Sequence, residues 1–301
     1  MRKTLFSGIA ACLLATVATA AEQSPSVIWT VGQADRSASE FALAPDRFRD
    51  FLANDFGYED KYFLVGHSVP AADFPYVLPG PADTWGGTWP TSGWRTHQVN
   101  ILFGLKEIPS DGTCTLVVDL LDYAKNFLPL VKVSVNTQDA KFQLDAPGLS
   151  VADQRKPNQM EKIVDTLSIT GNLAKATPRR LEIPIRPGVL KAGGNEVTIT
   201  VLEGSWILFD RVSLEGPAGT NVEQPQQLFI RNIEAAPYEL ADGKRRVQPL
   251  LVDLEWLEGA PALSVELDGK EILNQRIETG RYQLEAPMPQ VKKAKKSAYR
   301  I

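Results

Sequence analysis

The chain has 301 residues, of which 44% are hydrophobic and 23% are charged, a composition that is ordinary for a globular protein. Its 32 lysines and arginines stand against 36 aspartates and glutamates, so the formal net charge is -4. This balance argues against nucleic acid as a partner, because binding to phosphates needs a basic face. No long apolar run follows the N-terminal segment, so we expect no transmembrane span.

The N-terminal segment, residues 1–20, reads as a signal peptide. Arg2 and Lys3 give it a positive start, an apolar stretch follows, and Ala18 and Ala20 are the small residues of a cleavage site. We expect cleavage after Ala20 and a mature protein that is secreted or periplasmic.

Only two cysteines are present, and one of them belongs to this signal. Cys12 would leave with it, so Cys114 has no partner for an intramolecular disulfide and is expected to be a buried hydrophobic residue. Residues 9–12 weakly resemble a bacterial lipoprotein box, which makes lipidation of Cys12 the alternative to cleavage after Ala20.

The mature chain opens with short elements. Residues 27–31 and 62–66 have the apolar and β-branched composition of strands. Between them, the spacing of Phe48 and Phe51 after Pro45 predicts a short helix within residues 41–51.

Residues 74–104 are the most distinctive stretch of the chain. Three of the six tryptophans lie here among glycines and prolines that rule out a helix and favour a shaped loop, which we call the tryptophan loop. The loop leads into a strand over residues 97–103, where apolar side chains alternate. Indole faces can pack against a sugar ring while nearby polar groups bond to its hydroxyls. The carbohydrate-binding candidates are therefore Trp85, Trp89, Trp94, Asp83, Arg95 and His97.

A structural alternative carries equal weight, because tryptophan is buried on average. On this interpretation the indoles close the end of a sandwich core. We expect Trp89 to be the exposed indole, Trp85 to belong to the core, and His97 to be a hydrogen-bonding residue at the base of the loop.

After the loop, short strand signals recur at regular spacing, each bounded by Gly, Pro, Asn or Asp, and such spacing is typical of a β-sandwich. Residues 146–165 predict a long surface loop. The predicted strands lie at residues 113–120, 130–135, 141–144, 166–170, 180–185, 196–202 and 206–214.

The last strands of this region carry a recognisable pattern. The pattern predicts an antiparallel ladder. It consists of a strand that ends at residue 185, a turn at Gly194-Asn195, and strands over 196–202 and 206–214. This run resembles the final strands of jelly-roll carbohydrate-binding modules. Together with the tryptophan loop, residues 26–216 resemble the third domain of polysaccharide lyase family 4, the rhamnogalacturonan lyases. The resemblance implies an all-β jelly-roll sandwich that binds polysaccharide or oligosaccharide and leaves catalysis to a separate domain.

Beyond residue 216 the composition changes. Residues 217–225 predict a linker, and residues 226–301 predict a smaller immunoglobulin-like β-sandwich with a hairpin at Asp268-Gly269. A strand starts at the last residues, so we expect this second domain to be incomplete and the chain to be the front part of a longer enzyme. The layout resembles the N-terminal region of large secreted glycoside hydrolases of the α-mannosidase type.

Motifs for chemistry are scarce. The sequence shows no metal-ligand spacing, no nucleophile elbow and no phosphate-binding loop, so no catalytic residue is assigned and no cofactor is expected. Asp210 could hold a structural calcium ion or cap a turn, and the turn is favoured because calcium needs six to eight oxygens. Three functions stay open: a carbohydrate-binding module, the N-terminal portion of a polysaccharide-degrading enzyme, and a structural spacer.

Overall fold

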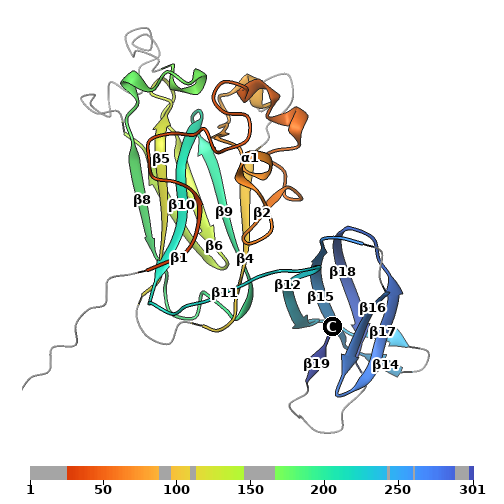
Figure 1. Ribbon diagram of the computed structural model, residues 1–301. Helices are drawn as coiled ribbons and strands as arrows, with labels where there is room; N and C mark the ends of the chain where they lie inside the picture. Colours follow the sequence, from red (N-terminus) through yellow and green to blue (C-terminus); the bar gives the residue numbers. More distant parts are fainter. Residues whose placement is uncertain are drawn as a thin grey trace, which may run out of the picture.

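The computed structural model describes residues 26–87, 96–108, 113–145, 167–242, 245–259, 262–288 and 298–301. The signal segment, the whole predicted loop over 146–165, and Trp89, Trp94 and Arg95 lie outside these residues. Within them the chain is nearly all β, and two sandwiches follow one another (Figure 1). No helix in the described ranges is long and apolar enough to cross a membrane.

The first sandwich has two antiparallel sheets of four main strands each. One sheet has the order β1 (Ser26–Gly32), β10 (Ile207–Gly216), β5 (Thr115–Tyr123), β8 (Arg179–Pro184). The other has the order β4 (Gln98–Leu105), β9 (Gly193–Glu203), β6 (Leu130–Val135), β7 (Gln138–Gln143). Most connections along the chain cross from one sheet to the other, and this strand order is that of a jelly roll. The predicted fold class is confirmed.

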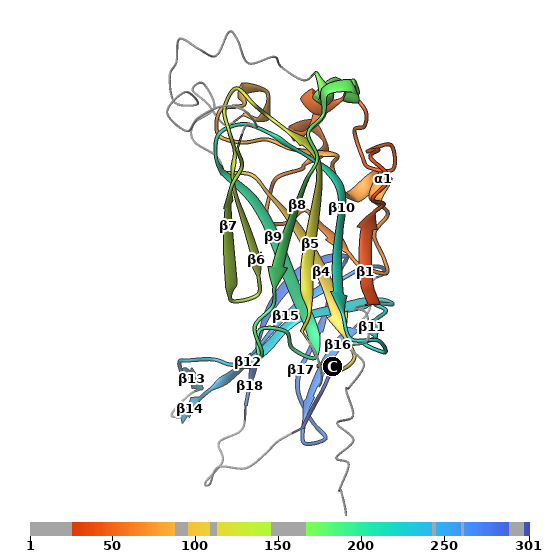
Figure 2. The same cartoon turned by 90° about the vertical axis from the view of Figure 1, so that its left-hand side faces the viewer.

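Three short strands extend these sheets. β2 (Tyr62–Leu64) runs parallel to β4, β3 (Val77–Leu78) pairs with β10, and β11 (Val222–Glu223) pairs with the end of β4. β11 lies within the segment predicted as a linker, so part of that segment belongs to the first sandwich. Figure 2 shows the strands of both sheets along one long axis, with loops at one end and the second sandwich at the other.

Alternation of side chains explains the core between the sheets. In β6, Val131, Val133 and Val135 are fully buried, while the residues between them are only half-buried. β5 and β10 are buried along almost their whole length, because they are the central strands of their sheet. This burial explains why the sequence of both strands is hydrophobic at nearly every position and does not alternate.

Two predicted elements were wrong. The helix expected within residues 41–51 is replaced by two single 3₁₀ turns, η1 (Phe48–Asp50) and η2 (Leu52–Asn54), and the second turn ends at the left-handed Asp55. Phe48 and Phe51 still bury their rings in the core. Their spacing in the sequence therefore correctly indicated two buried side chains, although no α-helix forms there.

The strand predicted at 166–170 is also absent from the part of that range the structure describes. There the chain forms the 3₁₀ turn η5 (Ser168–Thr170), bounded by left-handed residues Leu167 and Gly171, and η6 (Leu173–Lys175) follows. Two left-handed residues so close together reverse the chain too sharply for a strand. The remaining short helices are α1 (Pro70–Asp73) and η3 (Thr84–Gly86).

The second unit is a smaller β-sandwich. One sheet has the order β12 (Leu228–Ala235), β15 (Pro249–Trp256), β18 (Gly280–Pro287), and the other β17 (Lys270–Arg276), β16 (Ala262–Leu267), β19 (Tyr299–Arg300). A separate hairpin joins β13 (Leu240–Asp242) to β14 (Arg245–Val247). The hairpin predicted at Asp268-Gly269 is confirmed, with φ of 51° and 76° as a left-handed turn requires.

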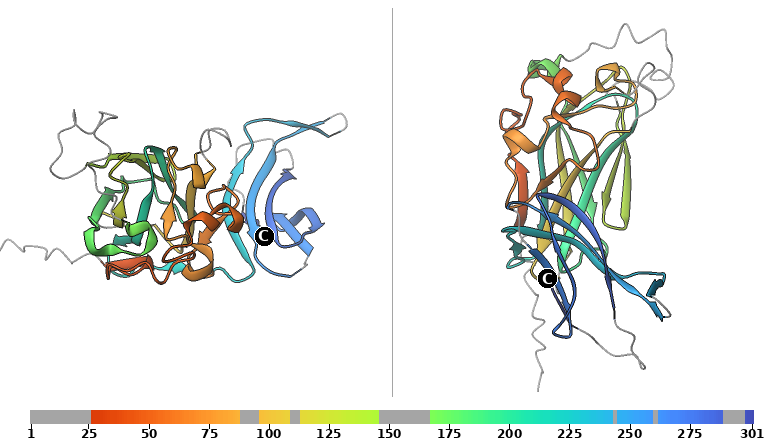
Figure 3. Two further views of the ribbon diagram at one scale, coloured as in Figure 1. Left: turned by 90° about the horizontal axis from the view of Figure 1, so that it is seen from above. Right: turned by 90° about the vertical axis from the view of Figure 1, so that its right-hand side faces the viewer.

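The two sandwiches touch through an apolar cluster and a buried ion pair. Leu64 and Leu102 of the first sandwich pack with Phe229 of the second. Beside them, Arg231 Nε donates to Glu255 Oε1 at 2.5 Å, and the guanidinium lies 5.2 Å from the centroid of the Tyr62 ring. Figure 3 shows the two bodies from above and from the side.

A glycine allows this close approach. A Cβ on Gly194 would lie 2.2 Å from the carbonyl oxygen of Ile230 in β12, so only glycine fits. The Gly194-Asn195 pair, predicted as a turn, lies inside the first residues of β9. Asn195 instead stabilises the preceding turn by bonding to the backbone of Lys191.

Candidate functional site

The tryptophan loop begins at the end of the first sandwich that lies away from the second one (Figure 1). At its start, η3 places Trp85 edge-on to Phe48, with ring centroids 5.0 Å apart, and also against Phe51. The Trp85 indole is partly buried and contacts the main core. Its position agrees with the expectation that Trp85 is the core member of the three tryptophans.

His97 lies at the other end of the loop, one residue before β4 begins. Its side chain is only 2% exposed, and its Nε2 hydrogen-bonds to the carbonyl oxygen of Gly86. The rings of Phe51 and Tyr58 meet the imidazole edge-on, at centroid distances of 5.5 and 6.1 Å. His97 therefore ties the C-terminal end of the loop to Gly86, which lies near the middle of the loop, and it is a hydrogen-bonding residue.

Asp83 is the second buried polar residue of this base. One carboxylate oxygen accepts the Gly80 N–H at 2.8 Å, and the other accepts the hydroxyl of Ser205. The Trp85 side chain also donates to this carboxyl group. Burial raises the pKa of Asp83 to about 6, although these donors act in the opposite direction.

The three described candidates of the tryptophan loop thus form one cluster. Asp83 and His97 are 6% and 2% exposed, so their visible role is to hold the base of the loop. Contact of Asp83, Trp85 and His97 with a sugar stays a prediction, as it does for Trp89, Trp94 and Arg95, which lie outside the described residues.

Asp210 belongs to a different cluster, on β10. Its carboxylate accepts the backbone N–H of Arg36 at 3.0 Å and that of Ser37. Burial raises its pKa to about 6. Of the two roles considered for Asp210, this geometry is that of a turn cap.

Potential catalytic or metal-binding clusters were sought across the described ranges. Those residues contain no group of three or more His, Cys, Asp or Glu side chains arranged to hold a metal ion. Cys114 is free and buried, and burial raises the pKa of its thiol, so the reactive thiolate is disfavoured.

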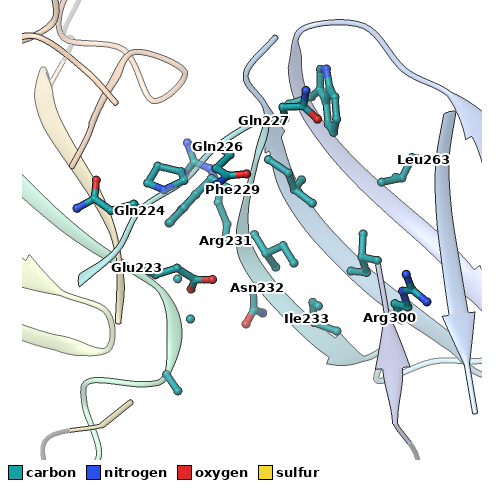
Figure 4. Close-up of a pocket in the computed structure, with 18 of the residues that line it drawn as sticks. Glu223, Gln224, Gln226, Gln227, Phe229, Arg231, Asn232, Ile233, Leu263 and Arg300 are labelled. Atoms are coloured by element: carbon teal, nitrogen blue, oxygen red, sulfur yellow. The ribbon is translucent and has the colours of Figure 1, made fainter. Parts of the chain in front are cut away.

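A groove that the sequence did not predict lies along the second sandwich, where it meets the first (Figure 4). Its volume is about 860 Å³, and we call it the interdomain groove. β12 and β16 form its two long sides, and residues 191–194 and 223–227 close it toward the first sandwich. No local pattern could have revealed it, because its walls come from segments far apart in the chain.

Comparison with known proteins places the first sandwich in a family. A family model described as "CBM-like: Polysaccharide lyase family 4, domain III" matches residues 27–214, which is more than half of the chain. No curated protein matches the chain.

Several solved structures resemble the chain weakly. A GH2 beta-galacturonidase from Eisenbergiella tayi, solved with galacturonate, has 10% sequence identity and a TM-score of 0.20, over 69% of this chain and 32% of that one. A beta-D-mannosidase from Dictyoglomus thermophilum has 8% identity and a TM-score of 0.20, over 64% of this chain and 24% of that one. The chain therefore spans about a third or less of the length of these enzymes.

Proposed function

Because the chain belongs to the family of CBM-like domains described as polysaccharide lyase family 4, domain III, we propose that it is a secreted, non-catalytic carbohydrate-binding module for complex polysaccharide. One observation carries the proposal: the matched residues 27–214 coincide with the jelly roll from β1 to β10. The family match thus covers a whole folding unit.

The proposed sugar site is the tryptophan loop. Its base is held by buried groups, since His97 bonds to Gly86 and Asp83 bonds to Gly80 and Ser205. A loop with a fixed base loses less conformational entropy when it binds a ligand, which favours affinity. Trp89, the tryptophan between Trp85 and Trp94, is the proposed stacking residue.

Affinity electrophoresis in gels that contain pectic or mannan polysaccharide tests this site. We expect retardation of the mature chain. We expect Trp89→Ala to remove it, since a stacked ring contributes its buried area and roughly 0.5 to 1.5 kcal/mol beyond that area. The melting temperature should change little, because a stacking residue is exposed in the absence of the sugar. Trp85→Ala is the matched control, because it removes an indole that packs on Phe48 and should lower the melting temperature. Undiminished retardation of the Trp89 variant would show that Trp89 is not the stacking residue.

We also propose that the module serves a glycan-degrading enzyme, as a polysaccharide lyase or a glycoside hydrolase. The support is the resemblance itself, because in the lyase family the cleaving residues belong to a separate domain. The alternative is that this chain itself contributes to cleavage as the N-terminal portion of such an enzyme.

Assays for hydrolysis and for lyase products on the same polysaccharides separate these possibilities. A module should release no product, whereas cleavage that one Asp or Glu substitution abolishes would favour the enzyme. A chain that neither binds nor cleaves any of these polysaccharides would behave as a structural spacer.

A further inference from the structure

The loop between β5 and β6, residues 124–129, lies beside the base of the tryptophan loop. The carbonyl oxygen of Phe127 accepts the N–H of Ser205 at 2.9 Å, and the hydroxyl of Ser205 donates to Asp83. One residue, Ser205, therefore bonds to both loops. We call residues 124–129 the β5–β6 loop.

The backbone of the β5–β6 loop is fixed in this position. Besides the bond at Phe127, the N–H of Ala124 donates to the carbonyl oxygen of Trp206 at 3.0 Å. Between these bonds, Gly204 has a φ of +81°, and a Cβ there would lie 2.3 Å from the carbonyl oxygen of Leu128. A glycine thus allows the β5–β6 loop to lie directly against the turn between β9 and β10.

On this fixed loop, the ring of Phe127 is exposed to solvent. The exposed large apolar side chains of the described ranges include two aromatic rings, Phe127 at 47% and Tyr238 at 42%. Tyr238 lies in the second sandwich, where its hydroxyl donates to Glu285. Phe127 lies at the end of the first sandwich that carries the proposed sugar site. An exposed ring on a fixed backbone offers a face for stacking at little cost in conformational entropy.

Two polar side chains near this ring have hydrogen-bonding capacity to spare. Glu203 is exposed and pairs in the ladder with Leu130, three residues after Phe127, and no described residue forms an ion pair with its carboxylate. Asn126 precedes Phe127, and its buried Oδ1 accepts no hydrogen bond from the described residues. A sugar hydroxyl can donate to the carboxylate directly and can reach the buried amide oxygen through a bridging water.

We propose that the β5–β6 loop is a second contact region of the sugar site, in which a sugar ring stacks on Phe127 and its hydroxyls bond to Glu203 and, through water, to Asn126. This inference rests on the proposed function and adds to it a region outside the tryptophan loop. Because the two regions belong to different loops, the ligand that contacts both is an oligosaccharide or polysaccharide chain and not a single sugar.

Affinity electrophoresis of the whole mature chain, at a series of polysaccharide concentrations, tests the stacking contact. Phe127→Leu keeps apolar bulk but removes the ring, so the dissociation constant should rise roughly twofold to tenfold. Phe127→Trp restores a ring and should bind like the parent. Both variants should keep the melting temperature of the parent, because the side chain is about half exposed. Tyr238→Leu is the matched control, since it removes a similarly exposed ring from the second sandwich and should leave binding unchanged.

The same gels test the polar contact. Glu203→Ala should weaken binding at least about tenfold, because a hydrogen bond to a charged group is lost, whereas Glu234→Ala, at an exposed position of the second sandwich, should not. If Phe127→Leu and Glu203→Ala bind like the parent while Trp89→Ala does not, the second region is rejected and the proposed function stands. If none of the gels retards the parent, the proposed function is itself wrong and this inference is overturned with it.

Discussion

At the scale of single residues, Gly57 shows how tightly the base of the tryptophan loop is packed. Its φ is +89°, and a Cβ there would lie 2.4 Å from Nδ1 of His97 and 2.7 Å from Cε1 of Phe51. The backbone of Gly57 is also bonded to the loop, since its carbonyl oxygen accepts the N–H of Gln98 at 3.2 Å. The position therefore needs glycine for both its conformation and its space.

Gly57→Ala should lower the free energy of unfolding by about 2 to 5 kcal/mol, the sum of left-handed strain and overpacking. Gly188→Ala is the matched control: its φ is +80°, but nothing lies within 4 Å of its added Cβ. The control should lose only about 1 to 2 kcal/mol, from strain alone. Urea denaturation measures both, and equal losses would show that contact with His97 contributes nothing.

Asp83 makes stability depend on pH. Burial raises its pKa from 3.8 to about 6 in the folded protein, so the folded state holds this proton more tightly than the unfolded chain does. The resulting stabilisation is present below pH 3.8 and is lost as the pH rises through about 6. Asp210 has the same direction of shift and adds to the effect.

In Asp83→Asn, the fall in unfolding free energy between pH 4 and pH 6 should be smaller than in the parent by roughly 1 to 3 kcal/mol. Urea denaturation at a series of pH values measures this. Parallel profiles for the parent and the Asp83 variant would contradict the assignment.

At the scale of elements, Gln138 joins the two sheets at one edge of the jelly roll. It lies in β7, and its Nε2 donates to the carbonyl oxygen of Pro184 at the end of β8, at 2.8 Å. Its Oε1 accepts the N–H of Arg186 at 2.9 Å. One buried amide thus pairs with both kinds of backbone group from the opposite sheet.

Gln138→Ala should lower the free energy of unfolding by about 2 to 4 kcal/mol, because it leaves two backbone groups unpaired, and should speed hydrogen exchange at the ends of β7 and β8. Gln143→Ala is a control on the same strand. Gln143 is exposed and its hydrogen bonds are long, at 3.3 and 3.4 Å, so a change below about 0.5 kcal/mol is expected. Similar losses in both variants would rule out a special role for Gln138.

At the scale of the whole molecule, Arg231 controls how the two sandwiches are joined. Its side chain is 7% exposed, and besides Glu255 it lies 3.7 Å from Glu196 of the first sandwich. Glu255 also accepts the hydroxyl of Tyr62, and burial raises the pKa of both Tyr62 and Glu255. The carboxylate of Glu255 is therefore satisfied by groups from both sandwiches.

Arg231→Ala should uncouple the sandwiches, because it leaves Glu255 buried beside an empty space, at a cost of roughly 3 to 5 kcal/mol. Scanning calorimetry should then show two separate transitions, and small-angle X-ray scattering should show a larger maximum dimension. Arg246→Ala removes an arginine whose side chain is 81% exposed, and it should change neither measurement. A single unchanged transition in the Arg231 variant would show that other contacts, such as the apolar cluster at Phe229 and the hydrogen bond from Lys191 to Asn232, hold the two units together without this ion pair.

Local patterns were enough to predict the β class, the positions of most strands and the Asp268-Gly269 hairpin. These features are local: side-chain alternation sets which strand face is buried, and glycine next to aspartate allows a left-handed turn. The family resemblance of the first sandwich was also carried by short local runs, and it agrees with the matched family model.

The remaining features depend on how distant segments pack against one another. Phe48 and Phe51 have a spacing that fits a helix, but burial in the core could be reached with two 3₁₀ turns. Asp83 and Ser205 are 122 positions apart, so no window of sequence could pair them. The interdomain groove and the contacts of Arg231 likewise join distant segments, because the packing of two sandwiches, and no local preference, brings β9, β12 and β16 together.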